Sequence, residues 1–190
     1  MREKHPYGYF IPKKAKGMIV GSFPIGKFSD PKRRGEIKPH ELEFFFGGEK
    51  NLLWRLLGEC YEAPVKTKEQ VIKLLEREGL AIGDVITSCR RMAGKGSDSD
   101  LYDIVWNHKL LKIIQEHGIK KVYFTSRQVQ KWFDKLFPEA ELERVLLISP
   151  SAQSSRAVVR TEGYRAWKLA HPAGKTWDYI LAFYKSVFGK

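Results

Sequence analysis

Short apolar runs alternate with amphipathic stretches along most of the chain, and this alternation constrains the fold more than any other feature. The apolar runs predict strands, and the stretches with apolar residues on one face predict helices. The predicted strands are 17–21, 80–91, 119–126 and 144–149, and the predicted helices are 51–60, 67–79, 101–117, 127–137, 161–170 and 175–188. Strands that alternate with helices form a parallel sheet covered on both faces. We therefore expect an α/β fold whose ligand binds beyond the carboxyl ends of the strands.

The length and composition fit one domain spanning residues 1–190, because 190 residues can bury a core and no repeat or linker divides the chain. No apolar run is long enough to cross a membrane. The first ten residues lack the apolar core of a signal peptide, which predicts a cytoplasmic protein. Cys60 and Cys89 are far apart and predict reduced thiols, not a disulfide framework or a four-cysteine metal site.

The charge balance indicates a polyanionic partner. Thirty-four Lys and Arg residues against 22 Asp and Glu residues give a net charge of +12. A basic surface attracts nucleic acids because neutralising phosphates releases condensed counterions. The charge could instead serve solubility alone. The basic residues gather in segments 13–16, 27–38 and 90–95, which we expect to be loops, and this favours nucleic acid.

Gly21 and the Gly26-Lys27 pair have the G-x-x-x-x-G-K spacing of a phosphate-binding loop. That loop requires Ser or Thr directly after the lysine and must open into a helix. Phe28 stands at that position, and Pro31 and Pro39 prevent a regular helix beyond it. A nucleotide-hydrolysing protein is therefore the third of three functional hypotheses.

Four segments, taken together, resemble the uracil-DNA glycosylase superfamily, and most closely its branch that removes hypoxanthine or uracil. They are "MIVGSFPIG", "EFFFGGEKNLLWRLL", "GLAIGDVITSCRRMAGKGSDSDL" and "LLISPSAQSS", and they occur in the family's order. The resemblance implies a three-layer α/β/α domain with a central four-stranded parallel sheet. It also implies hydrolysis of the N-glycosidic bond of a flipped base, without a metal or other cofactor.

The resemblance assigns catalysis to Asn51. Much of the superfamily positions the attacking water with an Asp or Asn in the first motif, where this chain has Phe23. The related branch uses the Asn that maps to Asn51, whose carboxamide can orient water without ionising. Asn51 also suits a helix N-cap, which is the alternative interpretation. Ser149 stands where relatives carry His or Asn to stabilise the leaving base, and Ser is a weaker donor.

The remaining candidate residues follow from the same four segments. Phe45, with Phe46 as second choice, would stack on the flipped base, while either ring could belong to the core. Backbone N–H groups after Gly21, at Ser22 and Phe23, would bind base carbonyls. The candidate DNA contacts are Lys27, Arg90, Arg91, Ser97, Ser151, Gln153, Ser154 and Arg156. For the Ser-rich and basic stretches among them, a solvated loop is the alternative.

The leading hypothesis is a monofunctional DNA glycosylase, acting as a monomer on uracil or hypoxanthine in base excision repair. A nucleic-acid-binding protein with a glycosylase-like fold and no hydrolysis is the alternative. The chain departs from the family in the extra Ile25 and in Gly47-Gly48-Glu49-Lys50, which replaces a His-Pro. These departures bear on substrate preference more than on the fold.

Overall fold

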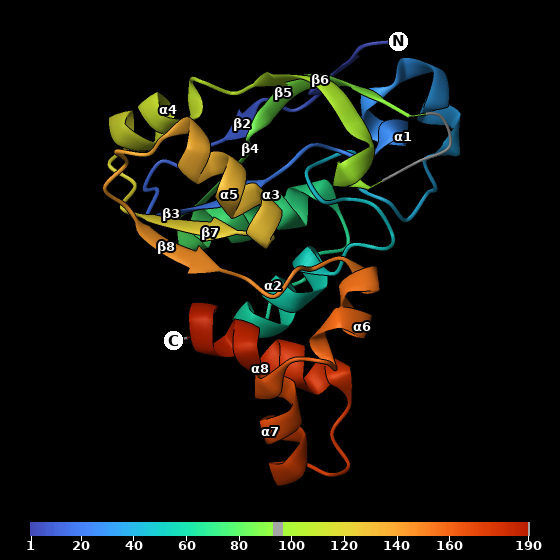
Figure 1. Cartoon of the computed structure of the whole chain (residues 1–190), viewed down its shortest axis with the longest axis vertical. Helices are drawn as coiled ribbons and strands as arrows, with labels where there is room; N and C mark the ends of the chain where they lie inside the picture. The colour runs from blue at the N-terminus through green and yellow to red at the C-terminus, as the bar shows by residue number, and fades with distance from the viewer. Residues whose placement is uncertain (93–96, 190) are drawn as a thin grey trace.

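The computed structural model describes residues 1–92 and 97–189, with the side chains of Gln153 and Ser155 left aside. Two sheets and a set of helices make up this part of the chain (Figure 1). The strands are β1 (Glu3–Lys4), β2 (Tyr9–Phe10), β3 (Gly17–Gly21), β4 (Leu80–Asp84), β5 (Ile86–Arg91), β6 (Leu101–Trp106), β7 (Lys121–Phe124) and β8 (Glu143–Leu146). The α-helices are α1 (Gly26–Ser29), α2 (Leu53–Tyr61), α3 (Lys68–Glu78), α4 (Leu110–Glu116), α5 (Arg127–Leu136), α6 (Ser155–Val158), α7 (Glu162–Ala170) and α8 (Thr176–Phe188).

The central sheet has the strand order β2-β4-β3-β7-β8. The strands β4, β3, β7 and β8 run parallel, as the alternation of strands and helices predicts. The four-stranded prediction is incomplete, because β2 pairs antiparallel with the outer edge of β4 and makes a fifth strand. Two residues are too few to give a strand pattern, so only the tertiary pairing reveals β2.

Helices cover both faces of this sheet, which gives the predicted α/β arrangement. Alternate side chains of β3 point to opposite faces, since side chains along a strand alternate. Ile19 packs in a core with α2, α3 and α8, whereas Met18 and Val20 pack in a second core with α4 and α5. In Figure 1 the α7 helix extends away from the sheet beside α8.

The α3 helix shows the start and stop signals read from the sequence. The hydroxyl of Thr67 accepts a hydrogen bond from the Gln70 amide, and the Gln70 side chain accepts from the Thr67 amide. This capping box satisfies N–H groups that have no partner inside a helix. Gly79 ends the helix at a φ of 68°, which a residue with a side chain rarely adopts.

The helix predicted over 101–117 is wrong in its first half. Residues 101–106 form β6, which pairs with β5 in a second, three-stranded sheet of order β1-β5-β6. The predicted strand over 80–91 is likewise two strands, since Val85 separates β4 from β5. Tertiary pairing overrides the local pattern here, because β6 gains its partners from residues 86–91 and not from its own neighbours.

Two segments that lie outside the predicted strands and helices contain short helical turns. Residues 22–48 include α1 and a 3₁₀ turn, Pro31–Glu36, and the segment after β8 includes a 3₁₀ turn, Ala152–Ser154, followed by α6. Both cysteines are free, and burial raises the pKa of each thiol to about 11. Within residues 1–92 and 97–189, no helix has the length and apolar character needed to span a bilayer.

Candidate active site

The candidate active site lies at the carboxyl edge of the central sheet. There β3 ends at Gly21 and β4 ends at Asp84, which are paired in the sheet register. Ligands of open parallel sheets bind at this edge. Phe46 reaches the same place, since a Cβ built on Gly21 would come within 3.0 Å of both the Phe46 ring and the Asp84 Oδ1 atom. Glycine therefore lets the strand backbone, a carboxylate and an aromatic ring meet.

Asn51 is joined to the Ser-rich segment that follows β8. An isolated antiparallel bridge pairs Asn51 with Ser151, and the Leu52 amide donates to the Pro150 carbonyl at 2.7 Å. The Ala152 amide donates to the Lys50 carbonyl at 2.9 Å. The structure thus brings together two segments that are about 100 residues apart in the sequence.

The Asn51 side chain supports the start of α2. Its Oδ1 atom accepts a hydrogen bond from the Leu53 amide at 3.0 Å, although the N-cap position itself is Leu52, one residue later than the N-cap alternative placed it. A carboxamide oxygen has two lone pairs, so this bond leaves one acceptor position and the Nδ2 donors for another group. Capping and water positioning are therefore chemically compatible at Asn51.

Ser149, Ser151 and Ser154 form one hydrogen-bonded turn. The Ser154 hydroxyl lies 2.6 Å from the carbonyls of both Ser149 and Ser151. The α8 helix holds the start of this turn, because the hydroxyl of Tyr184 donates to the Ile148 carbonyl at 2.8 Å. The Gln153 side chain lies outside the described residues.

The two candidate stacking rings have different environments. Phe45 is only 1% exposed and packs against Phe44, Tyr7 and His5 in an aromatic cluster. The Phe45 carbonyl also accepts from Trp54 Nε1 at 2.8 Å, which holds this residue in the core. Phe46 is partly exposed, lies over Gly21 and has a φ of 53°, unusual for a bulky residue. The ring available at the sheet edge is that of Phe46.

Asp84 lies in the third of the four resembling segments, and the sequence analysis gave it no role in the site. It is 5% exposed, and its Oδ2 atom lies 2.8 Å from His5 Nε2. Asn107 fixes the backbone at this point, since its Nδ2 donates to the Asp84 carbonyl at 2.8 Å. Tyr9 in turn donates to Asn107 Oδ1. The available signal was the position of Asp84 at the end of an apolar strand, but its partners are distant in sequence.

A second carboxyl group, that of Asp98, contacts Ser22, the residue after Gly21. The Ser22 hydroxyl donates to Asp98 Oδ1 at 2.8 Å. Burial raises the pKa of the Asp98 carboxyl, and the nearby charge of Asp84 acts in the same direction. The amide N–H groups of Ser22 and Phe23 have no hydrogen-bond partner among the described residues.

Two of the predicted DNA contacts are held inside the protein. Lys27 Nζ contacts both carboxylate oxygens of Glu41, and the Glu41 side chain is fully buried. The Arg91 guanidinium, 5% exposed, pairs with Glu3 and donates to the Pro24 carbonyl at 2.8 Å. These cations already have partners in the fold and are poorly placed to reach a phosphate.

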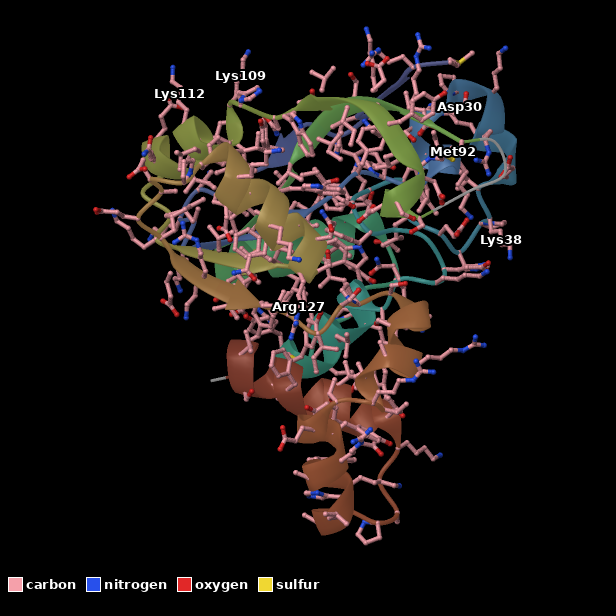
Figure 2. The ribbon with its side chains drawn as sticks, in the orientation of Figure 1. Asp30, Lys38, Met92, Lys109, Lys112 and Arg127 are labelled. Atoms are coloured by element: carbon pink, nitrogen blue, oxygen red, sulfur yellow. The ribbon has the colours of Figure 1, made fainter. Side chains whose placement is uncertain are left out.

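Other basic side chains remain at the surface. Arg90 is 51% exposed beside Asp103, Arg156 is exposed on α6, and Ser97 is exposed before β6. Arg127 follows β7 at the carboxyl edge, is exposed, and forms no ion pair with the described carboxylates. Figure 2 shows its place between α5 and the segment that leads to α6. The sequence analysis missed Arg127, although its position directly after a strand was a usable signal.

The geometry after β3 is not that of a nucleotide-phosphate loop. The α1 helix has four residues and ends at Asp30, whose backbone is extended. Phe28 is buried and Lys27 points to Glu41, so neither a magnesium ligand nor a free lysine faces a phosphate. No group of three His, Cys, Asp or Glu side chains suited to a metal occurs within the described residues.

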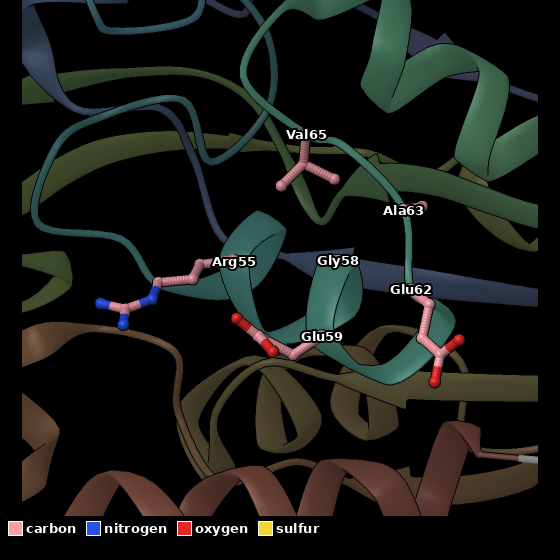
Figure 3. Close-up of a pocket in the computed structure, with 6 residues that line it drawn as sticks. All are labelled: Arg55, Gly58, Glu59, Glu62, Ala63 and Val65. Carbon is pink, nitrogen blue, oxygen red and sulfur yellow. The ribbon is translucent and has the colours of Figure 1, made fainter.

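A separate recess of about 300 Å³ lies along α2 (Figure 3). It is lined by Arg55, Gly58, Glu59, Glu62, Ala63 and Val65. None of the predicted site residues lines this recess. The Arg55 guanidinium stacks on the Trp177 ring, 4.2 Å from its centre, so it joins α2 to α8.

No protein-family model matches the sequence, and no curated protein matches it. The structure is similar to a solution NMR structure from Methanosarcina acetivorans, of a protein provisionally described as a uracil DNA glycosylase. The two superpose with a TM-score of 0.57 over 98% of this chain and 99% of the other, at 17% sequence identity. The chain has a uracil-DNA-glycosylase-like fold. At this identity the similarity extends to the fold alone.

Proposed function

We propose that this protein is a monofunctional DNA glycosylase that removes a flipped uracil or hypoxanthine, the first step of base excision repair. The observation that carries the proposal is the pairing of Asn51 with Ser151 in a chain with a glycosylase-like fold. This pairing puts a carboxamide able to orient water beside the Ser-rich segment proposed to enter DNA. The protein is proposed to act as a monomer in the cytoplasm.

In the proposed reaction the bond between the sugar C1′ atom and the base nitrogen breaks, and its electron pair leaves with the base. The water oxygen then bonds to C1′, and a proton of the water is lost to solvent. Asn51 holds this water through its free lone pair, and Ser149 donates to the leaving base. The products are the free base and an abasic sugar.

The described contacts refine the proposed binding groups. Phe46 replaces Phe45 as the proposed stacking ring, because Phe45 lies in the core. The amides of Ser22 and Phe23 stay the proposed donors to base carbonyls. The proposed phosphate contacts are now Arg90, Ser97, Arg127, Ser151, Ser154 and Arg156.

The test is a panel of oligonucleotides, each with one uracil, hypoxanthine or other altered base, followed by alkaline cleavage of abasic sites. Wild type is expected to cut at least one lesion. Asn51→Ala is expected to lower the single-turnover rate about 100-fold or more, with lesion binding changed less than about threefold. Asn51→Asp keeps an oxygen that can cap α2 and hold water, so it should retain more activity than Asn51→Ala.

Loss of the α2 cap must be separated from loss of catalysis. Thr67→Ala removes the N-cap hydroxyl of α3, which is not among the proposed site residues, and serves as the matched stability control. If Asn51→Ala and Thr67→Ala lower the rate equally, Asn51 is structural. If wild type binds lesion DNA and leaves every base uncut, the non-catalytic binding protein is the better description.

A further inference from the structure

The segment that follows the Ser-rich turn extends beyond the two packed cores. We call residues 156–175 the helical arm; it comprises most of α6, the α7 helix and the loop that leads to α8. Val158 packs in the core with α2 and α8, but α7 has no buried residue. In Figure 1 the α7 helix lies at one end of the long axis of the molecule. Because helices gain most of their stability from a packed face, α7 adds little to the fold, and we look for its role in its surface.

Contacts within the helical arm and with α8 hold it in one shape. The Trp167 ring stacks on His171, with ring centres 4.6 Å apart and an interplanar angle of 11°. A Cβ built on Gly174 would come within 3.0 Å of the Trp167 ring, so glycine lets the loop lie this close. The Tyr164 and Tyr179 rings meet edge to face at 5.3 Å, which joins α7 to α8. The helical arm is therefore a preformed surface, which lowers the entropic cost of binding.

The helical arm has an excess of cationic side chains. Residues 156–175 include five Lys and Arg residues and one acidic residue, Glu162. Lys168 is used inside the arm, because its Nζ donates to the Pro172 and Gly174 carbonyls at 2.7 and 2.6 Å. The other four cations are exposed and form no ion pair with a carboxylate of the described residues; they are Arg156, Arg160, Arg165 and Lys175. These four side chains remain available to an anionic partner.

The helical arm is joined directly to the candidate active site. It begins two residues after Ser154, whose hydroxyl lies 2.6 Å from the Ser151 carbonyl, and Ser151 pairs with Asn51. Both α6 and α7 contact α8, which packs the arm in place beside that turn. The α7 helix has nine residues and is about 14 Å long, at about 1.5 Å per residue. A DNA duplex rises about 3.4 Å per base pair, so α7 would lie along about four base pairs.

The helical arm also has a small apolar strip, which would be the contact surface for a second copy of the chain. Leu169 is 84% exposed, and Ala166 and Ala170, three and one residues away, are exposed on the same face of α7. A stable protein interface buries about 800 Å² on each partner. One leucine side chain and two methyl groups offer far less area than that. The four unpaired cations are the larger feature, and they favour a polyanion.

We infer that the helical arm binds the phosphate backbone of duplex DNA on one side of the lesion, through Arg160, Arg165 and Lys175. This inference rests on the proposed function for its DNA partner. It adds to that function a contact outside the segments assigned to catalysis and to base binding. Because phosphate contacts position a protein without reading sequence, the arm determines on which side of the lesion the protein requires duplex.

The test is equilibrium binding to duplexes that contain one tetrahydrofuran abasic-site analogue. This analogue resembles the reaction product whichever base is removed, and the protein cannot hydrolyse it. Two asymmetric duplexes have about 12 base pairs on one side of the analogue and about three on the other, in the two possible orders, and a third duplex has the long flank on both sides. Wild type is expected to bind one asymmetric duplex as tightly as the third, and the other about tenfold or more weakly.

A triple variant assigns that difference to the helical arm. Arg160→Gln, Arg165→Gln and Lys175→Gln together should make the two asymmetric duplexes bind equally. On the favoured duplex, this variant should lower the slope of log affinity against log salt by about 2–3, since each phosphate contact contributes about 0.9. On the other duplex the slope should not change, because the arm has no phosphates to contact there.

The matched control removes the same charge from another part of the surface. Lys109→Gln, Lys112→Gln and Lys120→Gln change exposed lysines that are not among the proposed DNA contacts. Figure 2 shows Lys109 and Lys112 at the opposite end of the molecule from α7. This variant should keep the difference between the two asymmetric duplexes. Both triple variants change only exposed side chains, so their melting temperatures should stay close to that of wild type.

Three results would overturn the inference. They are equal binding of the two asymmetric duplexes by wild type, a salt slope in the arm variant equal to that of the control, and a change of oligomeric state in Leu169→Gln with DNA binding of the arm variant unchanged. The last result would assign the arm to a second copy of the chain. A protein that shows the flank preference but cuts no lesion would refute the proposed catalysis and leave the role of the arm standing. Lesion cutting without a flank preference would refute the role of the arm alone.

Discussion

Replacing Lys27 with methionine should destabilise the protein, since Lys27 forms a buried ion pair. Lys27 Nζ lies 2.6 and 2.5 Å from the two Glu41 oxygens, and the two side chains are 13% and 0% exposed. Removing one partner of a buried pair costs about 3–5 kcal/mol, because the other charge stays buried. The amides of Lys38 and Glu49, 2.9 and 2.8 Å from Glu41, remain and offset part of this cost.

We therefore expect Lys27→Met to lower the free energy of unfolding by about 3 kcal/mol, measured by urea denaturation. For a chain of this size, that loss corresponds to a melting temperature lower by about 6–12 °C. Lys38→Met is the matched control, because Lys38 also pairs with a glutamate but is 51% exposed. An exposed pair contributes about 0–1 kcal/mol, so this variant should remain close to wild type.

The same variant distinguishes the structural role of Lys27 from a phosphate contact. A lost phosphate contact would lower the slope of log affinity against log salt by about 1, at little cost in stability. The reasoning is refuted if Lys27→Met unfolds like Lys38→Met and the salt dependence of DNA binding falls. A double variant, Lys27→Met with Glu41→Leu, should recover much of the lost stability, since no unpaired charge remains.

Three further predictions concern acid stability, the sheet edge and a helix cap. Burial opposes ionisation of Glu41, yet its hydrogen bonds hold its pKa below the ordinary value. The free energy of unfolding should therefore fall as the pH drops below about 4. The urea midpoint should depend less steeply on pH in Glu41→Gln than in wild type. Gly21→Ala should lower lesion cutting at least tenfold, because its Cβ would displace the Phe46 ring that is proposed to stack on the base. Gly35→Ala, with open space around it, should leave cutting unchanged. Thr67→Ala should lower the melting temperature by about 2–4 °C and leave lesion cutting unchanged, and a larger effect on cutting would contradict the separation of α3 from the site.

Local signals were sufficient where an element depends on its own neighbours. The strand 17–21 is buried at every position, and its short apolar run predicts a buried strand without reference to other segments. The α3 helix carries its own cap and its own glycine stop, so its prediction needed nothing from elsewhere. Residues 101–106 do not carry such local signals, because they form a strand only by pairing with residues 86–91.

The sequence predicted which segments meet at the site, but not which charged side chains pair with each other. Asn51 and Ser149–Ser154 were named from the sequence, and their segments do meet. Lys27 gives no sign in the sequence of being paired, since a lysine in a basic loop is normally solvated. Its partner Glu41 lies 14 residues away, and His5 lies 79 residues from Asp84. Pairings at these separations arise from the tertiary fold, which a local pattern does not encode.

The hydrogen bond from Tyr184 to Ile148 and the contact of His5 with Asp84 together have a consequence for biosynthesis. One holds the Ser-rich turn from the last helix, and the other holds the sheet edge from the first residues. A nascent chain that already carries the four motif segments, but still has α8 inside the ribosome, would lack the anchor of that turn. Competence for DNA should therefore appear only once α8 has emerged and packed against that turn.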